Sequence, residues 1–263
     1  CNIAVTFPLN KLMFRQQVED LSVQSAYRSM RVEGWRRLYR GVGPPLVQRG
    51  LSMSLMFGLY DWYYKRLAPV IQREEARSVG AALLAGSSEA LLTPLERMQT
   101  ILQHRHYNRR FASMWDVASK LRPNGLSEFY RGATAILLRN GPANALFFTL
   151  REPFRDSLPG RDHGASLHLK TFASGALLGA AISSLFFPLN VAKTLMQSQI
   201  GGPHASVSST LRAAIQERNG IRGLFRGVHV NYSRSLLSWG IMNSVYEALR
   251  QIDLPPSKRR NDG

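Results

Sequence analysis

A short proline motif occurs three times along the chain. The residues FPLN at 7–10 recur as TPLE at 93–96 and as FPLN at 187–190, so the prolines stand 86 and 94 residues apart. A glutamine follows nine residues after each proline. Further on, each copy has a second motif: a glycine, four variable residues, an aromatic residue, an arginine and a closing glycine. The closing glycines are Gly41, Gly132 and Gly227. Because the motifs recur in the same order, the chain consists of three related units, called here repeats 1, 2 and 3.

Each repeat has the pattern of a helix, a short amphipathic helix and a second helix. The proline lies within an apolar helical pattern, where its missing backbone N–H kinks the helix. The expected units are residues 1–67, 76–157 and 166–252, followed by a basic polar tail at 253–263. Only seven residues precede Pro8, so we expect the first helix of repeat 1 to lack its outer half in this sequence.

The longest uncharged stretch, residues 171–192, has the length of a membrane span. Its 22 residues can cross a hydrocarbon core of roughly 30 Å at about 1.5 Å per residue of helix. Further apolar stretches, with one or two ionisable groups each, lie at 41–60, 79–95, 132–150 and 227–246. Two fold classes fit this pattern: an all-α membrane protein and a soluble all-helical protein with five core helices.

The excess of basic residues restricts the partners of the chain. Lys and Arg number 34 against 17 Asp and Glu, which gives a net charge of +17. This charge suits an anionic membrane and its anionic solutes, or nucleic acid, so a soluble basic nucleic-acid-binding helical protein is one candidate. The single cysteine, Cys1, excludes a disulfide-stapled domain and a thiolate metal site. We find no nucleophile–base constellation, metal-ligand spacing or phosphate-binding glycine loop, and therefore expect no enzyme.

Charged residues inside the apolar stretches are the first candidates for solute binding. A charge at this depth is costly unless it faces a water-filled cavity. Residues that bind an asymmetric solute should also differ between repeats, as they do seven and eight residues after each closing glycine and at Glu89, whose equivalents are Ile3 and Ser183. The alternative is that these charges pair with one another for structural reasons. The predicted solute-binding residues are Gln48, Arg49, Glu89, Arg139, Asn140 and Arg234.

Each closing glycine begins the second long helix of its repeat and follows an arginine. Free backbone N–H groups at a helix start, next to a cation, suit the phosphate of a lipid. The alternative is that the glycines are turn residues only. The predicted lipid-binding residues are Arg40, Gly41, Arg131, Gly132, Arg226 and Gly227.

The threefold proline motif, followed three times by glycine, four residues, aromatic, base and glycine, resembles the mitochondrial carrier family, solute carrier family 25. The resemblance covers nearly the whole chain. It implies six transmembrane helices in threefold pseudosymmetry around one central solute site, with short amphipathic helices on the matrix side. It also implies a multi-pass transporter of the mitochondrial inner membrane in contact with cardiolipin and other inner-membrane lipid. We expect a monomer with no nucleic-acid partner.

The resemblance also implies a gate on each side of the solute site. The family's matrix-side motif has an acid and a base in each repeat, but here only Glu96 and Lys193 remain, because Asn10, Met13, Gln99 and Asn190 fill the other positions. The predicted matrix-side gate consists of Glu96, Lys193, Gln17, Gln103 and Gln197. The predicted cytoplasmic-side gate consists of Asp61, Tyr64, Glu152, Arg155, Glu247 and Arg250, with ion pairs Asp61–Arg155 and Glu152–Arg250 and a hydrogen bond from Tyr64 to Glu247.

Several stretches resemble the branch of the family that carries NAD in animals. These stretches are 14–17, 38–41, 44–46, 55–60, 89–90, 93–97, 139–141, 197–202 and 238–241. The resemblance implies NAD as the transported solute and no cofactor. Arginines would then hold the pyrophosphate, and Glu89 the nicotinamide cation or a ribose. The alternative is a carrier of another nucleotide or of coenzyme A.

Overall fold

The computed structural model describes residues 2–107, 110–157, 165–218, 220–238 and 241, and all regular structure in them is helical. Repeat 1 contains α1 (Asn2–Glu19), α2 (Val23–Glu33), α3 (Trp35–Leu38) and α4 (Gly43–Leu67). Repeat 2 contains α5 (Glu74–Ser88), η1 (Glu89–Leu92), α6 (Thr93–Gln103), η2 (Arg105–Tyr107), α7 (Met114–Leu121), η3 (Arg122–Asn124), α8 (Leu126–Phe129) and α9 (Ala133–Ser157). Repeat 3 contains α10 (Ala165–Leu185), α11 (Phe187–Ser198), α12 (Val207–Glu217) and α13 (Ile221–Leu224), and residues 228–238 are helical again.

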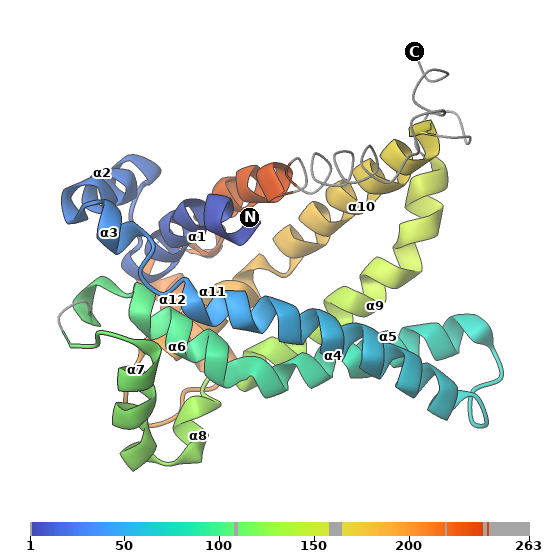
Figure 1. The fold of residues 1–263 in the computed structure, drawn as a ribbon, viewed down its shortest axis with the longest axis horizontal. Coiled ribbons are helices and arrows are strands. Elements are labelled where there is room, and N and C mark those ends of the chain that lie inside the picture. The colour runs from blue at the N-terminus through green and yellow to red at the C-terminus, as the bar shows by residue number, and fades with distance from the viewer. Residues whose placement is uncertain (1, 108–109, 158–164, 219, 239–240, 242–263) are drawn as a thin grey trace, which may run out of the picture.

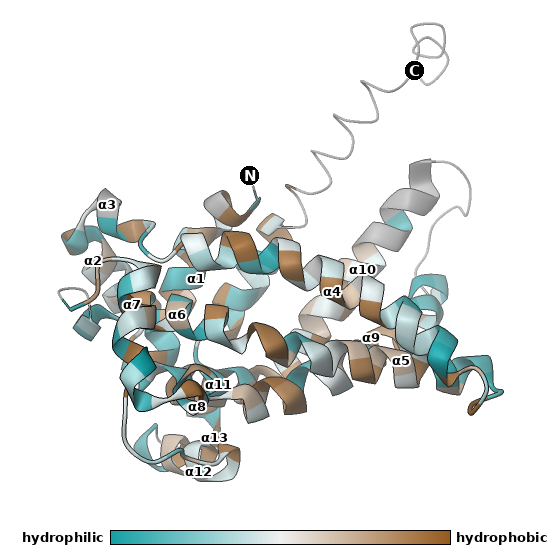
Figure 2. Ribbon diagram, turned by 60° about the horizontal axis from the view of Figure 1, so that its bottom comes forward, coloured by the Kyte–Doolittle hydropathy of each residue, from teal (hydrophilic) through white to brown (hydrophobic). Residues whose placement is uncertain are grey.

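The short helices lie together at one end of the molecule, and the long helices extend away from them (Figure 1). Hydrophobic residues are concentrated along the long helices, whereas hydrophilic residues gather toward the two ends (Figure 2). Repeats 1 and 2 have the same order: a long helical segment, a short surface helix, a single turn of helix and a second long helix. The predicted tail at 253–263 lies outside the described residues.

The motif prolines end or bend helices in two of the three repeats. Pro94 lies in the first turn of α6, directly after the η1 turn, and Pro188 lies in the first turn of α11. Between Ala173–Leu185 and Phe187–Ser198 the helix axis bends by 61°. Proline produces such breaks because it has no N–H to donate to the preceding turn. In repeat 1, α1 continues through Pro8 as one helix.

No single described helix has both the length and the apolar character of a membrane span, but the bent pair Ala173–Leu185 and Phe187–Ser198 has them together.

The closing glycines occupy positions that no other residue fits easily. Gly41, Gly132 and Gly227 have φ angles of 85°, 85° and 99°, a conformation that favours glycine. A Cβ atom on Gly132 would lie 3.0 Å from Cγ of Gln197 on α11. These glycines therefore allow the start of each second helix to approach the first helix of the next repeat.

The arginine before each closing glycine reaches into the next repeat. Arg40 donates hydrogen bonds to the carbonyl oxygens of Tyr107 and Phe111. The guanidinium of Arg131 donates to the carbonyl oxygens of Gly201 at 2.6 Å and Pro203 at 2.5 Å. Arg226 closes the ring, because it donates to the Asp20 carbonyl at 2.6 Å and pairs with its carboxylate at 2.5 Å. The three arginines thus join the repeats to one another, and their contact with lipid stays a prediction.

A buried ion pair within repeat 2 also hydrogen-bonds to the backbone of repeat 3 at the same end. Arg97 on α6 pairs with Glu128 on α8 at 2.5 Å, and the two side chains are 0% and 3% exposed. Arg97 also donates to the backbone carbonyls of Gln197 and Gln199, at 2.5 and 2.6 Å. Glu128 accepts in addition the backbone N–H of Gly201 at 3.0 Å. A fully buried pair with this many hydrogen bonds fixes α6, α8 and the segment after α11 relative to one another.

Candidate solute-binding cavity

Two neighbouring hollows lie between the long helices. One has a volume of about 430 Å³ and the other about 490 Å³, both within the size range of small-molecule sites. Both are lined by Asn10, Glu89, Arg139, Asn140 and Arg234, so they meet at these five residues. The second hollow contains all six predicted solute-binding residues, because Gln48 and Arg49 also line it.

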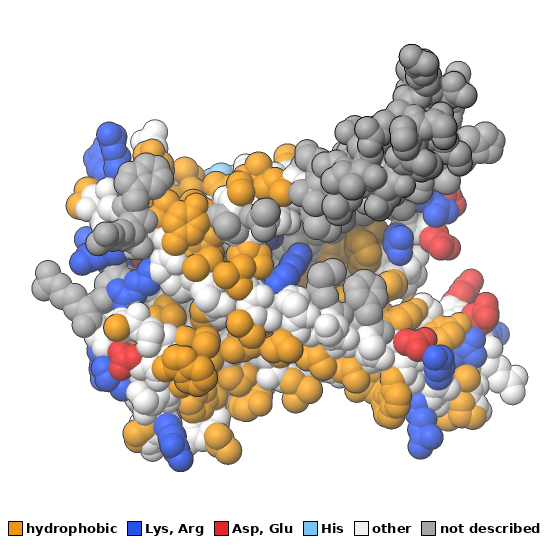
Figure 3. Space-filling model, in the orientation of Figure 1, with side chains coloured by type: hydrophobic (Ala, Val, Ile, Leu, Met, Phe, Trp, Pro, Cys, Tyr) orange, Lys and Arg blue, Asp and Glu red, His pale blue; other side chains and the backbone are white. Residues whose placement is uncertain are grey.

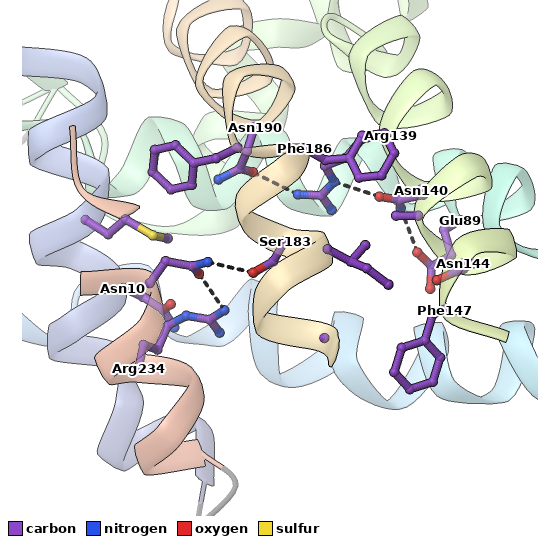
Figure 4. Close-up of a pocket in the computed structure, with 16 residues that line it drawn as sticks. Asn10, Glu89, Arg139, Asn140, Asn144, Phe147, Ser183, Phe186, Asn190 and Arg234 are labelled. Carbon is purple, nitrogen blue, oxygen red and sulfur yellow. Dashed lines mark hydrogen bonds between the residues drawn. The ribbon is translucent and has the colours of Figure 1, made fainter. Parts of the chain in front are cut away.

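Hydrogen bonds connect Arg139 with Glu89 through a neutral amide (Figure 4). Arg139 donates through Nε to Asn140 Oδ1 at 2.8 Å, and Asn140 Nδ2 donates to Glu89 Oε2 at 2.6 Å. The other carboxylate oxygen of Glu89 accepts from the Ser52 hydroxyl at 2.9 Å. Glu89 therefore forms no direct ion pair with any described residue, and its link to Arg139 runs through Asn140.

Two arginines of the cavity, Arg139 and Arg234, also donate hydrogen bonds to neutral side chains. Arg139 Nη1 donates to Asn190 Oδ1 at 2.8 Å, and Arg234 Nη2 donates to Asn231 Oδ1 at 3.0 Å. Asn231 in turn donates to the Ser183 hydroxyl at 2.8 Å (Figure 4). Within the described ranges, neither arginine has a carboxylate within ion-pair distance. Their guanidinium groups therefore have no direct carboxylate partner among the described residues, which suits the binding of an anionic solute.

Twelve of the residues that line the first hollow were not among the predicted site residues. All twelve are uncharged, and they include Asn10, Asn144, Phe147, Ser183, Phe186, Asn190 and Asn231. These residues were not predicted because amides and aromatic rings do not carry the cost of a charge within the membrane. Asn190 did carry a signal, since it replaces the acid of the repeat 3 proline motif.

A narrow layer of polar residues closes the cavity toward the short helices. Lys193 Nζ lies 3.0 Å from Glu96 Oε2, and Gln48 donates to the other Glu96 oxygen at 2.7 Å. The Lys193 and Glu96 side chains are 14% and 16% exposed. Gln48, predicted to bind solute, thus bonds to the gate in this conformation.

The buried glutamines Gln17, Gln103 and Gln197 lie within the same layer, and in the part of the chain that the structure describes two of them bridge repeats through side-chain hydrogen bonds. Gln17 accepts a hydrogen bond from Thr194, and Gln197 accepts one from Thr100, each at 3.1 Å. The residue equivalent to these threonines in repeat 1 is Phe14, which has no hydroxyl to offer Gln103. The contact between repeats 1 and 2 therefore lacks the bridge that the other two contacts have.

At the opposite end, the described residues of the predicted cytoplasmic-side gate bond locally. Asp61 pairs with Lys65 on its own helix at 2.6 Å, and Arg155 pairs with Asp156 at 2.9 Å. Tyr64 accepts a hydrogen bond from Arg77 at 2.7 Å. The predicted Asp61–Arg155 pair is not formed in this conformation. Glu152 is exposed, and Glu247 and Arg250 lie outside the described residues.

Three helical repeats around a cationic cavity, closed at one end by polar side chains, define a solute carrier. A sequence profile described as mitochondrial carrier protein matches residues 2–69, 74–162 and 165–253. The chain therefore belongs to the mitochondrial carrier family, whose members are multi-pass transporters of the mitochondrial inner membrane and not enzymes.

Individual relatives match along nearly the whole chain. The mitochondrial nicotinamide adenine dinucleotide transporter SLC25A51 of Homo sapiens is 44% identical over 254 residues, which cover 95% of this chain and 85% of the relative. The human transporter SLC25A52, of the same description, is 44% identical over 251 residues, covering 94% and 84%. The mitochondrial arginine transporter BAC2 of Arabidopsis thaliana is 30% identical over 256 residues, covering 93% and 85%.

Proposed function

We propose that this chain carries NAD across the mitochondrial inner membrane by alternating access through the central cavity. The observation that carries the proposal is the combination of two arginines without carboxylate partners and one carboxylate, Glu89, held by neutral donors. NAD presents two phosphates and a cationic nicotinamide ring, so its charges match this arrangement. The relatives described as NAD transporters support the same solute.

The proposed arrangement in the membrane has six spans, two from each of the units 1–67, 76–157 and 166–252. The spans are α1, α4, α5 with α6, α9, α10 with α11, and the helix that begins at 228. Large apolar side chains such as Leu91, Leu185 and Leu236 are more than 60% exposed, as lipid contact requires. On the face in Figure 3, a hydrophobic band separates charged side chains at the two ends.

Cardiolipin is the lipid that we propose for the start of α9. A hollow of about 740 Å³ lies there, lined by Tyr130, Gly132 and Met196 together with His204 and Val207 near the start of α12. Helix starts present free N–H groups, which favour phosphate, and the apolar lining suits acyl chains. Equivalent contacts are proposed at Arg40–Gly41 and Arg226–Gly227.

A competition assay tests the choice of solute. Uptake of labelled NAD into liposomes that contain the purified chain is measured with unlabelled NAD, another nucleotide or coenzyme A outside. The proposal expects NAD to compete best. Stronger competition by coenzyme A or by a mononucleotide would assign the carrier to that solute instead.

Glu89→Gln is expected to weaken NAD uptake more than uptake of a nucleotide without the nicotinamide cation. Glutamine keeps the size of the side chain but removes its Coulomb attraction for the ring. Initial uptake rates of NAD and of ADP-ribose into liposomes measure the difference. Equal losses for both solutes would show that Glu89 acts only on the structure of the cavity.

From the matrix-side gate we predict that the empty carrier can change conformation, so that net uptake occurs without a counter-solute. Alternating access requires this gate to break when the opposite one forms, and a single ion pair, Glu96–Lys193, holds it here. A second pair can be built between repeats 1 and 2 with Asn10→Asp and Gln99→Lys, where the glutamine bridge is also missing. A pair that water reaches when the gate opens is worth about 0–1 kcal/mol, so we expect net uptake into empty liposomes to slow by up to about fivefold.

The control for this prediction is exchange into liposomes preloaded with NAD. Exchange should slow less, because bound solute offsets the cost of breaking the gate. Each single substitution should also have a smaller effect than the double one. An absolute need for internal NAD in the unmodified protein would contradict the prediction.

A further inference from the structure

The two hollows of the cavity differ in the residues that they do not share. Apart from the five residues where they meet, the 430 Å³ hollow is lined only by uncharged residues, among them Ala143, Asn144, Phe147, Ile182 and Phe186. We call it the aromatic lobe. The 490 Å³ hollow, the polar lobe, is lined in addition by Arg49, Ser52 and Glu96. A solute with two unlike ends joined by a charged linker would fit such a divided cavity.

The place where the lobes meet carries the positive charge. Arg139 and Arg234 line both lobes, and each donates to an asparagine instead of a carboxylate. A pyrophosphate placed here can accept hydrogen bonds from both guanidinium groups, which bind phosphate oxygens in a planar, paired manner.

The aromatic lobe has the side chains that recognise a neutral base. Phe147 lies two helical turns beyond Asn140 on α9, and Phe186 stands at the junction of α10 and α11 (Figure 4). Both rings are half-buried and line the lobe. The Asn144 carboxamide lies on the same face of α9 and makes no hydrogen bond with the described residues, so it is available to a solute. Aromatic faces stack on bases, and asparagine pairs with the edge of adenine.

The polar lobe has the hydrogen-bonding groups that suit a riboside, and Arg49, a cation, lines it as well. Ser52 lines only this lobe, and its bond to Glu89 turns one carboxylate oxygen toward it. Glu96, the second carboxylate of the lobe, is already paired with Lys193. Glu89 lines both lobes, so its attraction for a cationic ring does not by itself choose a lobe. The aromatic side chains place the neutral base in the aromatic lobe, and this leaves the polar lobe, where Ser52 holds Glu89, to the other half of the solute.

We propose that the dinucleotide lies across both lobes in one orientation, with the pyrophosphate between Arg139 and Arg234 and the adenine in the aromatic lobe against Phe147 and Phe186. The nicotinamide riboside then occupies the polar lobe beside Glu89 and Ser52. This inference rests on the proposed transport of NAD and assigns Phe147, Phe186 and Asn144 to recognition of the adenine half.

Inhibition by the two halves of the solute tests the orientation. The inhibition constants of ADP and of nicotinamide mononucleotide are measured against labelled NAD uptake into liposomes that contain the full chain. Removal of one stacking ring weakens base binding about tenfold. We therefore expect Phe147→Ala and Phe186→Ala each to raise the inhibition constant of ADP about tenfold and to leave that of nicotinamide mononucleotide within about twofold. Glu89→Gln should produce the opposite pattern.

Two further variants separate stacking from packing. Phe147→Leu keeps an apolar side chain without the ring, and it should still weaken inhibition by ADP. Phe148→Ala removes the neighbouring ring, which stacks on Tyr60 outside the aromatic lobe, and it should change neither inhibition constant selectively.

The outcomes distinguish this inference from the function on which it rests. Suppose that Phe147→Leu still takes up NAD but weakens inhibition by ADP and by nicotinamide mononucleotide equally, or weakens only the latter. Either result would overturn the orientation and leave the transport function intact. Failure of ADP to inhibit the unmodified carrier would also overturn it. Absence of NAD uptake by the unmodified chain would instead contradict the proposed function.

Discussion

Arg139→Ala and Arg234→Ala should each reduce the initial rate of NAD uptake by about 10- to 150-fold. A hydrogen bond to a charged group contributes about 1.5–3 kcal/mol, and each 1.4 kcal/mol changes an equilibrium tenfold. Within the described chain neither arginine has a carboxylate partner, so the loss of its charge removes attraction for phosphate without freeing a buried anion. Uptake into liposomes measures the rate, and the amount of protein left after alkaline extraction of the membranes measures insertion.

The matched control is Arg212→Ala. Arg212 lies on the exposed face of α12, away from both lobes, so its removal should leave uptake within about twofold, as for most surface substitutions. A normal rate in either cavity variant, with normal insertion, would remove that arginine from the solute site.

Glu128→Ala should cause the largest loss of stability among single substitutions near the gate. The carboxylate is 3% exposed and accepts hydrogen bonds from Arg97, Arg131 and the backbone of Gly201. Its removal leaves a fully buried guanidinium without its anion, which costs about 3–5 kcal/mol. The unfolding temperature of the purified protein in detergent measures the loss.

Two comparisons make this prediction specific. Glu75→Ala removes an exposed carboxylate from the first turn of α5, where it is worth about 0.3–1 kcal/mol. Glu128→Gln keeps an acceptor without the charge and should fall between the two. If Glu128→Ala and Glu75→Ala lower the unfolding temperature equally, the buried pair does not hold repeats 2 and 3 together.

The repeated motifs made the helical order and the central cavity predictable. The glycine spacing placed Arg139 and Arg234 at equivalent depths, and the structure brings both to one cavity with Glu89. The prediction of equivalent depth succeeds because the distance along a helix axis is proportional to the number of residues. The Glu96–Lys193 contact was likewise expected, because the resemblance to the mitochondrial carrier family implied it.

Contacts that depend on irregular backbone could not be predicted in this way. Arg131 bonds to carbonyl groups of the loop after α11, and every residue has a carbonyl, so no sequence pattern marks such a partner. The pairing of Arg97 with Glu128 joins different helices, and neither 3.6-residue periodicity nor repeat symmetry identifies it. Neutral cavity residues such as Asn144 carry no desolvation cost large enough to distinguish them from packing residues.

Accumulation of labelled NAD in liposomes that contain the purified chain tests the central claim most directly. Protein-free liposomes and liposomes with the Arg139→Ala variant are measured in parallel. The account predicts time-dependent accumulation with the unmodified chain, saturation at high external NAD and near-background uptake with the variant. Background uptake by the unmodified chain, in liposomes that contain cardiolipin and correctly inserted protein, would contradict it.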